Sequence, residues 1–204
     1  MTWRKRIFDL FFASLLVVVL GPILLVLLAW LLVKQGRPLF YVAERMKDVD
    51  QPFLLWKLRT MTVVDQDAGV SGGDKTARIT PTGAWLRRRR LDEFPQLYNI
   101  LKGDLSFVGP RPPLREYVSR YPDVYARVLQ SRPGVTGLAS IAYHRHEALL
   151  LGRCDSATET DQVYSQLCVP TKARLDLIYQ RHQSVCYDFD LVFQTIGNIF
   201  RRGG

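Results

Sequence analysis

Two adjacent carboxylates, Asp92 and Glu93, follow a run of four arginines in the segment RRRRLDEFPQ, residues 87–96. Downstream of this pair, apolar residues recur at helical spacing. This spacing predicts that Asp92 lies at or near a helix N-cap and that Pro95 lies in the first turn. A helix N-terminus favours an ionised carboxylate and also attracts phosphate, as attack on a phosphoryl group requires. The alternative is a capped surface helix with solvated arginines and a structural acid.

The two carboxylates are expected to have separate roles. Neighbouring helical residues point about 100° apart, so Asp92 and Glu93 cannot share a proton face to face. An anionic nucleophile ~4 Å from an anionic phosphate is repelled by roughly 4 kcal/mol at an effective dielectric constant of about 20. Nearby arginines, and a divalent metal, would offset that repulsion.

Two further segments carry cations suited to phosphate. The run Phe53–Met61 predicts a strand with Lys57 and Arg59 on one face, although a solvated strand face is the simpler interpretation. In DLSFVGPRPP, residues 104–113, one glycine and three prolines fix an irregular backbone that presents Arg111 rigidly. A rigid arginine suits bidentate recognition of a diphosphate, and a structural salt bridge is the alternative.

Two other clusters of potential metal ligands are weaker. His144, His146 and Glu147 form the sequence HRHE, in which two histidines two residues apart suit a strand face. No third ligand follows at a recognisable spacing, so a metal site is not expected there. The acids of the glycine-rich loop Asp65–Asp74 lack the remaining EF-hand ligands, so no calcium site is assigned.

Composition limits the function classes. The chain has 204 residues, enough for one domain with a core and an appendage, and its net charge of +9 indicates an anionic partner. Nucleic acid is disfavoured because no aromatic residues interleave with the arginine run and no nucleic-acid motif is present. Cys154, Cys168 and Cys186 form neither an even framework nor a CxxC pair, which indicates a reduced, cytoplasmic environment.

An uncharged segment, Leu10–Val33, precedes the polar part of the chain. As a straight helix it would measure about 36 Å, enough to cross a hydrocarbon core of about 30 Å. Gly21-Pro22 weakens the helix at its centre, and basic residues flank both ends, so neither end is favoured for export. From these residues alone a kinked transmembrane helix is the commoner outcome, and a re-entrant helix is the alternative.

Later segments predict further helices. Tyr117–Gln130 is amphipathic with a break at Tyr121-Pro122, Lys172–Arg181 has helical spacing, and the apolar stripe that begins at Leu191 suits a helix on the core or in the membrane interface. Ala157–Gln166 is predicted as a loop or a frayed helix.

Taken together, these motifs resemble the bacterial sugar transferase family, the small monotopic phosphoglycosyl transferases. The most specific block is LDEFPQLYNILKGDLSFVGPRP at residues 91–112. Weaker blocks are KRIFD at residues 5–9, KLRTM at 57–61, RITPTG at 78–83, RPGVTG at 132–137 and the pattern from Leu175 through Asp188 to Thr195. The resemblance covers nearly the whole chain.

The resemblance implies a helix-rich α/β fold with a small sheet, in a membrane-associated catalytic domain. Residues 1–36 would form a re-entrant membrane helix broken at Gly21-Pro22, and residues 37–204 would form a cytoplasmic catalytic domain with interfacial helices. Both ends of the apolar segment would then be cytoplasmic, which reverses the preference for a transmembrane helix. The implied location is the cytoplasmic face of the bacterial inner membrane, on anionic phospholipid, and a homodimer is compatible with it.

The implied activity is transfer of a phosphosugar from a UDP-sugar to a polyprenyl phosphate, such as undecaprenyl phosphate, with release of UMP. Asp92 would be the nucleophile that forms a phosphosugar–enzyme intermediate, and Glu93 would assist it. Mg²⁺ would bridge Asp92 and the diphosphate. The implied substrate-binding residues are Arg87, Arg111, Lys57, Arg59, Pro110, Pro112 and Asp176.

The sequence departs from the family pattern in three places. Gly21 stands where serine often precedes the membrane proline, Arg88–Arg90 are more basic than usual, and the segment after RPGVTG differs from the commoner pattern. Two other classes of function remain open. A transferase that moves sugar without phosphate would release UDP, and a membrane-anchored binding protein would turn over no UDP-sugar.

Overall fold

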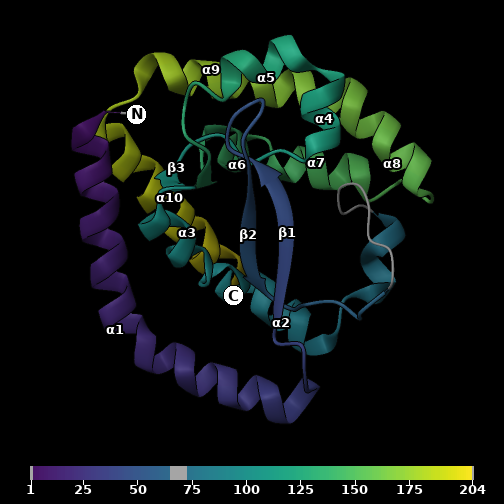
Figure 1. The fold of residues 1–204 in the computed structure, drawn as a ribbon. Coiled ribbons are helices and arrows are strands. Elements are labelled where there is room, and N and C mark those ends of the chain that lie inside the picture. Colours follow the sequence, from purple (N-terminus) through teal and green to yellow (C-terminus); the bar gives the residue numbers. More distant parts are fainter. Residues whose placement is uncertain (1, 65–72, 204) are drawn as a thin grey trace.

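The computed structural model describes residues 2–64 and 73–203, and it describes side chains for residues 2–64 and 75–198. The loop Asp65–Asp74, where no calcium site is expected, therefore lies largely outside the described residues, as do the last side chains of the apolar stripe. The fold is helix-rich with little sheet, as the sequence predicts (Figure 1). The elements are α1 (Trp3–Gln35), β1 (Phe40–Met46), β2 (Pro52–Leu58), α2 (Pro81–Arg88), α3 (Gln96–Lys102), β3 (Ser106–Val108), α4 (Arg115–Arg120), α5 (Pro122–Val128), β4 (Gly134–Thr136), α6 (Leu138–Ala142), α7 (His144–Leu151), α8 (Ala157–Val163), α9 (Val169–His182) and α10 (Val185–Gly203), with 3-10 turns at Gly73–Arg78 and Leu91–Glu93 and a π-helix at Tyr164–Cys168.

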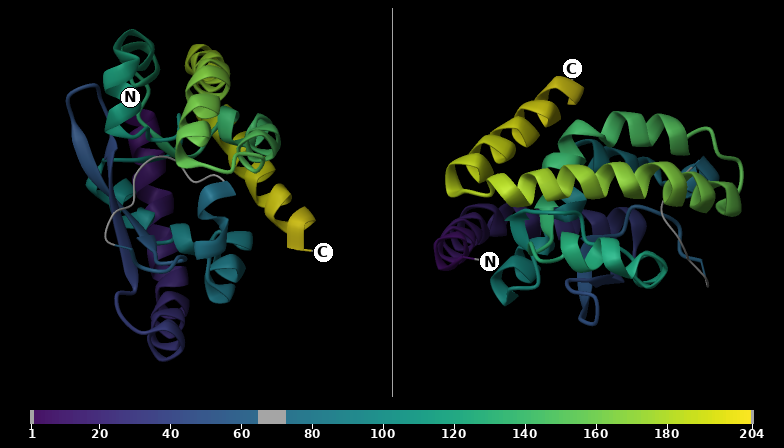
Figure 2. Two further views of the ribbon diagram at one scale, coloured as in Figure 1. Left: turned by 90° about the vertical axis from the view of Figure 1, so that its right-hand side faces the viewer. Right: turned by 90° about the horizontal axis from the view of Figure 1, so that it is seen from above.

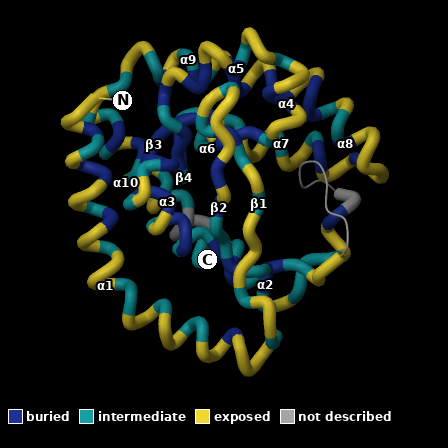
Figure 3. The backbone as a smooth tube through the Cα atoms, viewed as in Figure 1, coloured by how far each residue is buried: buried dark blue, intermediate teal, exposed yellow. Residues whose placement is uncertain are grey.

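The apolar N-terminal segment forms one continuous helix, α1, with Pro22 inside it. Figure 1 shows α1 bent into two arms, the usual consequence of an internal proline that lacks an N–H donor. The predicted break is therefore a bend in an unbroken helix. By length and composition α1 could cross a membrane, and most of its surface is exposed or half-exposed (Figure 3).

Both arms of α1 nevertheless contribute to the core. In the first arm, Ala13 packs with Phe53 and Leu55 of β2 and with Ile100 of α3. In the second arm, Leu31 packs with Leu58 of β2 and Leu86 of α2. The β1–β2 hairpin is antiparallel, with Tyr41 opposite Lys57, and β2 packs against α1, α2 and α3. A third cluster fills the space among α4, α5, α7 and α9, at the end of the molecule away from the second arm of α1 (Figure 2).

A short parallel sheet joins the two glycine-containing turns of the sequence. β3 pairs with β4, so that Ser106 lies opposite Gly134 and Val108 opposite Thr136. The two backbones come so close that a Cβ added to Gly109 would lie 2.1 Å from the carbonyl oxygen of Arg132. The RPGVTG turn therefore packs directly against the backbone of the proline-rich loop, and this close approach requires glycine at position 109.

Most predicted helices are present, with one correction. The break at Tyr121-Pro122 separates α4 from α5, and α9 and α10 cover the two C-terminal predictions. The segment Ala157–Gln166 is helical, because Ser156 caps α8 and a π-helix continues it. The HRHE sequence begins helix α7, so the prediction of a strand face was wrong there.

Candidate active site

The acidic pair lies in a 3-10 turn that leads into α3. This turn begins after Arg90, a non-glycine residue with a left-handed backbone (φ 56°). Such a conformation is uncommon outside glycine and clusters at functional sites. α3 starts at Gln96 with Pro95 at its N-cap, so the prediction that Pro95 lies in the first turn was wrong by one position. The 3-10 turn, rather than the α-helix, therefore orients Asp92 and Glu93.

Glu93 is surrounded by cations from three elements. Its carboxylate accepts from Lys57 Nζ at 3.4 Å and from Arg90 Nε at 3.1 Å, and Arg111 Nη1 lies 3.9 Å away. Burial alone would raise the pKa of Glu93, but attraction by Lys57, Arg90 and Arg111 outweighs burial and lowers the pKa to about 2. Glu93 is therefore ionised and holds the cations of the site in place.

Asp92 is placed differently from its neighbour. It is buried, with 8% of its surface exposed, and in the described part of the chain it makes no ion pair within 4 Å. Burial and the adjacent charge of Glu93 raise the pKa of Asp92, while Lys57 and Arg87 partly offset the rise. A carboxylate that is near two cations but paired with neither is available to react with an incoming phosphorus.

Arg87 reaches the site because α2 packs against the backbone of Thr60. A Cβ added to Gly83 would lie 1.9 Å from the carbonyl oxygen of Thr60, so only glycine permits this approach. One turn later, Arg87 donates from Nε to the Thr60 hydroxyl at 2.9 Å. Burial lowers the pKa of Arg87, and the charge of Asp92 opposes that shift. The RITPTG motif therefore positions one of the predicted phosphate-binding arginines beside Asp92.

Lys57 and Arg111 also lie at the acidic pair, and their contacts with substrate stay a prediction. The side chain of Lys57 is 19% exposed, and burial lowers its pKa despite the attraction of Glu93. The side chain of Arg111 is 45% exposed, so its guanidinium is accessible to a ligand. Its loop is held by the hydrogen bond from the Gly134 amide to the Pro110 carbonyl at 2.8 Å.

Arg59 makes a different set of contacts. Its guanidinium donates to the carbonyl oxygens of Gln35 and Pro38, both at 2.7 Å, and of Gly36 at 3.2 Å. These contacts satisfy carbonyl groups at the C-terminal end of α1. Arg59 follows the end of β2, so its position gives it a structural role, and its contact with substrate stays a prediction.

Asp176 lies on α9, near the proline-rich loop. It lines a small pocket together with Arg111, Pro112 and Lys172. Burial raises the pKa of Asp176 to about 7, although Lys172 acts in the opposite direction. The glutamate of the HRHE sequence, Glu147, pairs with Lys172 at 2.7 Å, and the described residues contain no group of three metal-ligating side chains.

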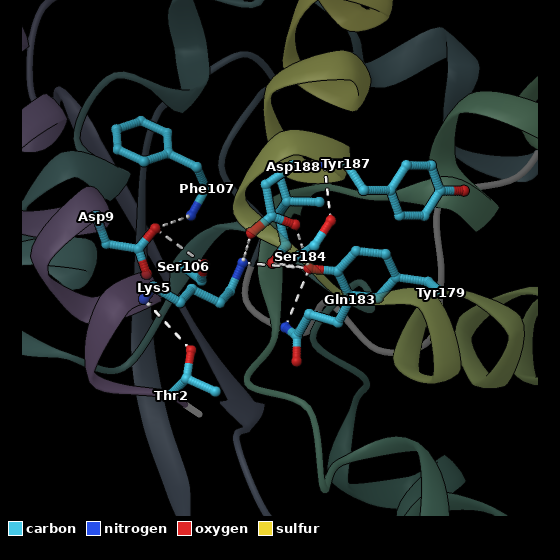
Figure 4. Close-up of polar contacts among 11 residues, drawn as sticks. Thr2, Lys5, Asp9, Ser106, Phe107, Tyr179, Gln183, Ser184, Tyr187 and Asp188 are labelled. Atoms are coloured by element: carbon cyan, nitrogen blue, oxygen red, sulfur yellow. Dashed lines mark hydrogen bonds and ion pairs between the residues drawn. The ribbon is translucent and has the colours of Figure 1, made fainter.

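Sequence reasoning missed a buried polar network at the N-terminal end of α1 (Figure 4). The ammonium group of Lys5 pairs with Asp188, which also accepts from the Tyr179 hydroxyl at 2.6 Å. One turn later, Asp9 accepts from the Ser106 hydroxyl at 3.0 Å and from the Phe107 amide at 3.2 Å. The sequence feature that could have indicated this network is the set of charged residues in KRIFD, directly before an apolar segment. The network fixes α1 to β3, α9 and α10.

Comparison with known proteins identifies the family to which the chain belongs. The model of the bacterial sugar transferase family matches residues 1–202. The sugar transferase EpsL of Bacillus subtilis (strain 168) is 42% identical over 137 residues, which are 67% of each chain. The UDP-glucose:undecaprenyl-phosphate glucose-1-phosphate transferase of Caulobacter vibrioides is 32% identical over 201 residues, 96% of this chain and 69% of the relative.

A longer relative, the UDP-glucose:undecaprenyl-phosphate glucose-1-phosphate transferase of Klebsiella pneumoniae, is 32% identical over 196 residues. The match covers 94% of this chain but only 39% of that protein. The family model extends almost from end to end of the chain. The chain belongs to the bacterial sugar transferase family.

Proposed function

We propose that the protein transfers a sugar phosphate from a UDP-sugar to a polyprenyl phosphate, such as undecaprenyl phosphate, and releases UMP. The names of the Caulobacter and Klebsiella relatives support both the donor class and the acceptor class. The structural observation that carries the proposal is the difference in ion pairing between the two carboxylates of the acidic pair. Glu93 holds three cations, whereas Asp92 is buried beside them and has no ion-pair partner among the described residues.

The first step is attack on the donor. A carboxylate oxygen of Asp92 forms a bond to the β-phosphorus, and the bond from that phosphorus to the oxygen bridging the α-phosphate breaks. UMP leaves with the bonding electrons, and the sugar phosphate stays on Asp92 as an acyl phosphate. Arg87 and Arg111 attract the negative charge of the diphosphate, which offsets its repulsion by the nucleophile.

The second step regenerates the enzyme. A phosphate oxygen of the polyprenyl phosphate attacks the same phosphorus, the bond to Asp92 breaks, and a polyprenyl diphosphate sugar forms. The role of Glu93 in both steps is positional, because its three ion pairs fix Lys57, Arg90 and Arg111 around the reacting phosphorus. A group with a pKa of about 2 stays ionised near neutral pH and is unsuited to proton transfer.

The residues present fit a magnesium ion held mainly by substrate. Mg²⁺ is commonly bound by one or two carboxylates together with substrate phosphates. Asp92 is the carboxylate without an ion pair in the described site, and no cluster of three ligands competes with it. When bound, the ion would withdraw negative charge from the diphosphate.

Two attachments support a re-entrant topology for α1. At its N-terminal end, Lys5 pairs with Asp188 of α10. At its C-terminal end, Arg59 donates to the Gln35 carbonyl oxygen. A transmembrane crossing would separate these ends by a hydrocarbon core of about 30 Å, yet both are attached to one domain by charged side chains. Residues 1–36 therefore enter and leave on one side, which we assign to the cytoplasmic face of the inner membrane.

The proposed activity is tested by UMP release across a panel of UDP-sugars with undecaprenyl phosphate. We expect release with at least one donor and no release by the Asp92→Asn variant. Release of UDP instead of UMP would identify transfer of sugar without phosphate. Substantial UMP release by Asp92→Asn would exclude Asp92 as the nucleophile.

The topology is tested separately with single cysteines at positions 2 and 35, in a background lacking Cys154, Cys168 and Cys186. Both introduced cysteines should be shielded from a membrane-impermeant reagent in intact cells and react after permeabilisation. Labelling of one end alone in intact cells would establish a transmembrane helix.

A further inference from the structure

A small pocket adjoins the acidic pair through a shared arginine. Its lining includes Arg111, Pro112, Tyr125, Tyr164, Lys172 and Asp176. Arg111 also lies 3.9 Å from Glu93, so the pocket and the site of phosphoryl transfer have this guanidinium in common. The pocket volume is about 60 Å³. Sites for whole ligands commonly measure about 300–1,000 Å³, so this pocket has room for only a small part of a ligand.

One buried acceptor in the pocket has no partner in the described part of the chain. Asp176 is 7% exposed, and its Oδ1 atom makes no hydrogen bond to a described residue. Buried polar atoms in proteins nearly always have partners, so this atom requires an explanation. Lys172 lies one helical turn before Asp176, but its ammonium group donates to Glu147 at 2.7 Å and to the Tyr164 hydroxyl at 3.4 Å. The ammonium group of Lys172 is therefore committed to Glu147 and Tyr164, and the Oδ1 atom of Asp176 is open to a ligand.

The backbone around this pocket is also irregular. Tyr164 begins a π-helix that ends at Cys168 and leads directly into α9, which carries Lys172 and Asp176. π-Helical turns are rare and occur frequently at functional sites. Here the turn joins the tyrosine that lines the pocket to the helix that carries the unpartnered carboxylate.

We propose that Asp176 accepts a hydrogen bond from a hydroxyl group of the UDP-sugar donor, while Arg111 contacts the diphosphate of the same molecule. This inference rests on the proposed function. The donor carries hydroxyls both on its ribose and on the transferred sugar, and both groups present the same chemistry. A bond from a hydroxyl to a buried carboxylate is selective, because an analogue without that hydroxyl leaves the acceptor unpaired.

The test is a double cycle of protein and donor variants. Wild type, Asp176→Leu and Asp176→Asn are compared with the tightest-binding UDP-sugar of the panel and with analogues of it that each lack one ribose or sugar hydroxyl. Leucine has a similar size and no acceptor, whereas asparagine keeps one acceptor oxygen. Both the Kd for the donor and kcat/KM for UMP release are measured.

We expect wild type to bind one analogue at least about tenfold more weakly than the parent donor, as loss of a charge-assisted hydrogen bond implies. Asp176→Leu should bind the parent donor more weakly than wild type does, by a similar factor, and the loss of affinity in Asp176→Asn should be smaller. For the analogue that lacks the contacted hydroxyl, both variants should bind as tightly as wild type does. Whether that analogue lacks a ribose or a sugar hydroxyl identifies the source of the bond. The same substitutions at the exposed Asp190 of α10 should leave all values unchanged.

An equal loss with the parent donor and with every analogue would overturn the proposal, because Asp176 would then act without contacting a donor hydroxyl. Unchanged donor binding in both Asp176 variants would also overturn it. The Kd cycle requires no turnover. A wild type that binds a UDP-sugar but releases no UMP would therefore contradict the proposed function, while the cycle would still decide whether Asp176 contacts the donor.

Discussion

Removing the charge of Asp176 is expected to stabilise the protein at neutral pH. Burial raises the pKa of Asp176 from 3.8 to about 7. As the pH rises between about 4 and 7, the unfolded chain has released this proton while the folded chain retains it. Folding in this pH window therefore requires the carboxyl group to take up a proton, and this uptake lowers the free energy of unfolding. For this residue, stability falls as pH rises through that window.

The penalty can be estimated from the two pKa values. A difference of about 3 in pKa corresponds to about 4 kcal/mol in the free energy of unfolding, reached near pH 7 and above. Asparagine avoids this penalty but places an amide in the same pocket, which costs about 1–3 kcal/mol if it stays unpaired. The Asp176→Asn variant should therefore gain about 1–3 kcal/mol near pH 7.5, or roughly 2–10 °C in Tm for a chain of this length.

The assay is thermal unfolding in detergent at several pH values. Near pH 5 the penalty on the carboxyl group is about 2–3 kcal/mol smaller than near pH 7.5, so the advantage of Asp176→Asn should shrink to about zero. Asp190→Asn, on the exposed face of α10, is the matched control and should show neither effect. A Tm difference that stays constant between these two pH values would refute the reasoning, because the Asp176 carboxyl would then titrate as it does in the unfolded chain.

Three further predictions concern the acidic pair and its support. Glu93→Gln should destabilise the protein by about 3 kcal/mol at neutral pH, because three cations lower the pKa of Glu93 from 4.5 to about 2. That contribution is lost as pH falls from about 5 to 2, so the Tm difference between wild type and Glu93→Gln should be smaller near pH 3 than near pH 7. Equal Tm differences at the two pH values would argue against it. In the same variant, loss of the adjacent charge lowers the pKa of Asp92. The acid limb of the pH profile for its remaining UMP release should therefore move to lower pH. An unmoved limb would count against this coupling. Gly83→Ala should reduce UMP release at least about tenfold, because the new Cβ would lie 1.9 Å from the Thr60 carbonyl oxygen and displace α2. Gly197→Ala, where a Cβ meets no described atom within 4 Å, is the matched control, and equal activities of the two variants would contradict this role of Gly83.

The parts of the site that are local in sequence could be predicted. The pattern LDEFPQLYNILKG carries its own turn, helix and glycine C-cap, and Gly103 ends α3 with a left-handed backbone. Pro22 predicts a disturbance in α1, although the helix bends there without breaking. The proline-rich loop predicts a rigid Arg111, and the structure places it beside Glu93. In each case the determining interactions lie within a few residues along the chain.

The parts that depend on distant contacts could not be predicted. Lys5 and Asp188 are 183 positions apart, and nothing in either segment indicates the other as its partner. Alternation along Phe53–Met61 placed Arg59 with Lys57, but β2 ends at Leu58, and the backbone beyond it turns Arg59 toward the end of α1. The pairing of β3 with β4 likewise depends on close backbone contact between two turns, which residue spacing along one segment does not encode.

The central claim is that Asp92 becomes esterified to a sugar phosphate during turnover. The most direct test is mass spectrometry of enzyme quenched after mixing with its UDP-sugar in the absence of polyprenyl phosphate. The account predicts that the peptide containing Asp92 gains the mass of one sugar phosphate, that this mass disappears when polyprenyl phosphate is added, and that the Asp92→Asn variant never acquires it. Stoichiometric release of UMP with the added mass on another residue, or with no added mass at all, would contradict the account.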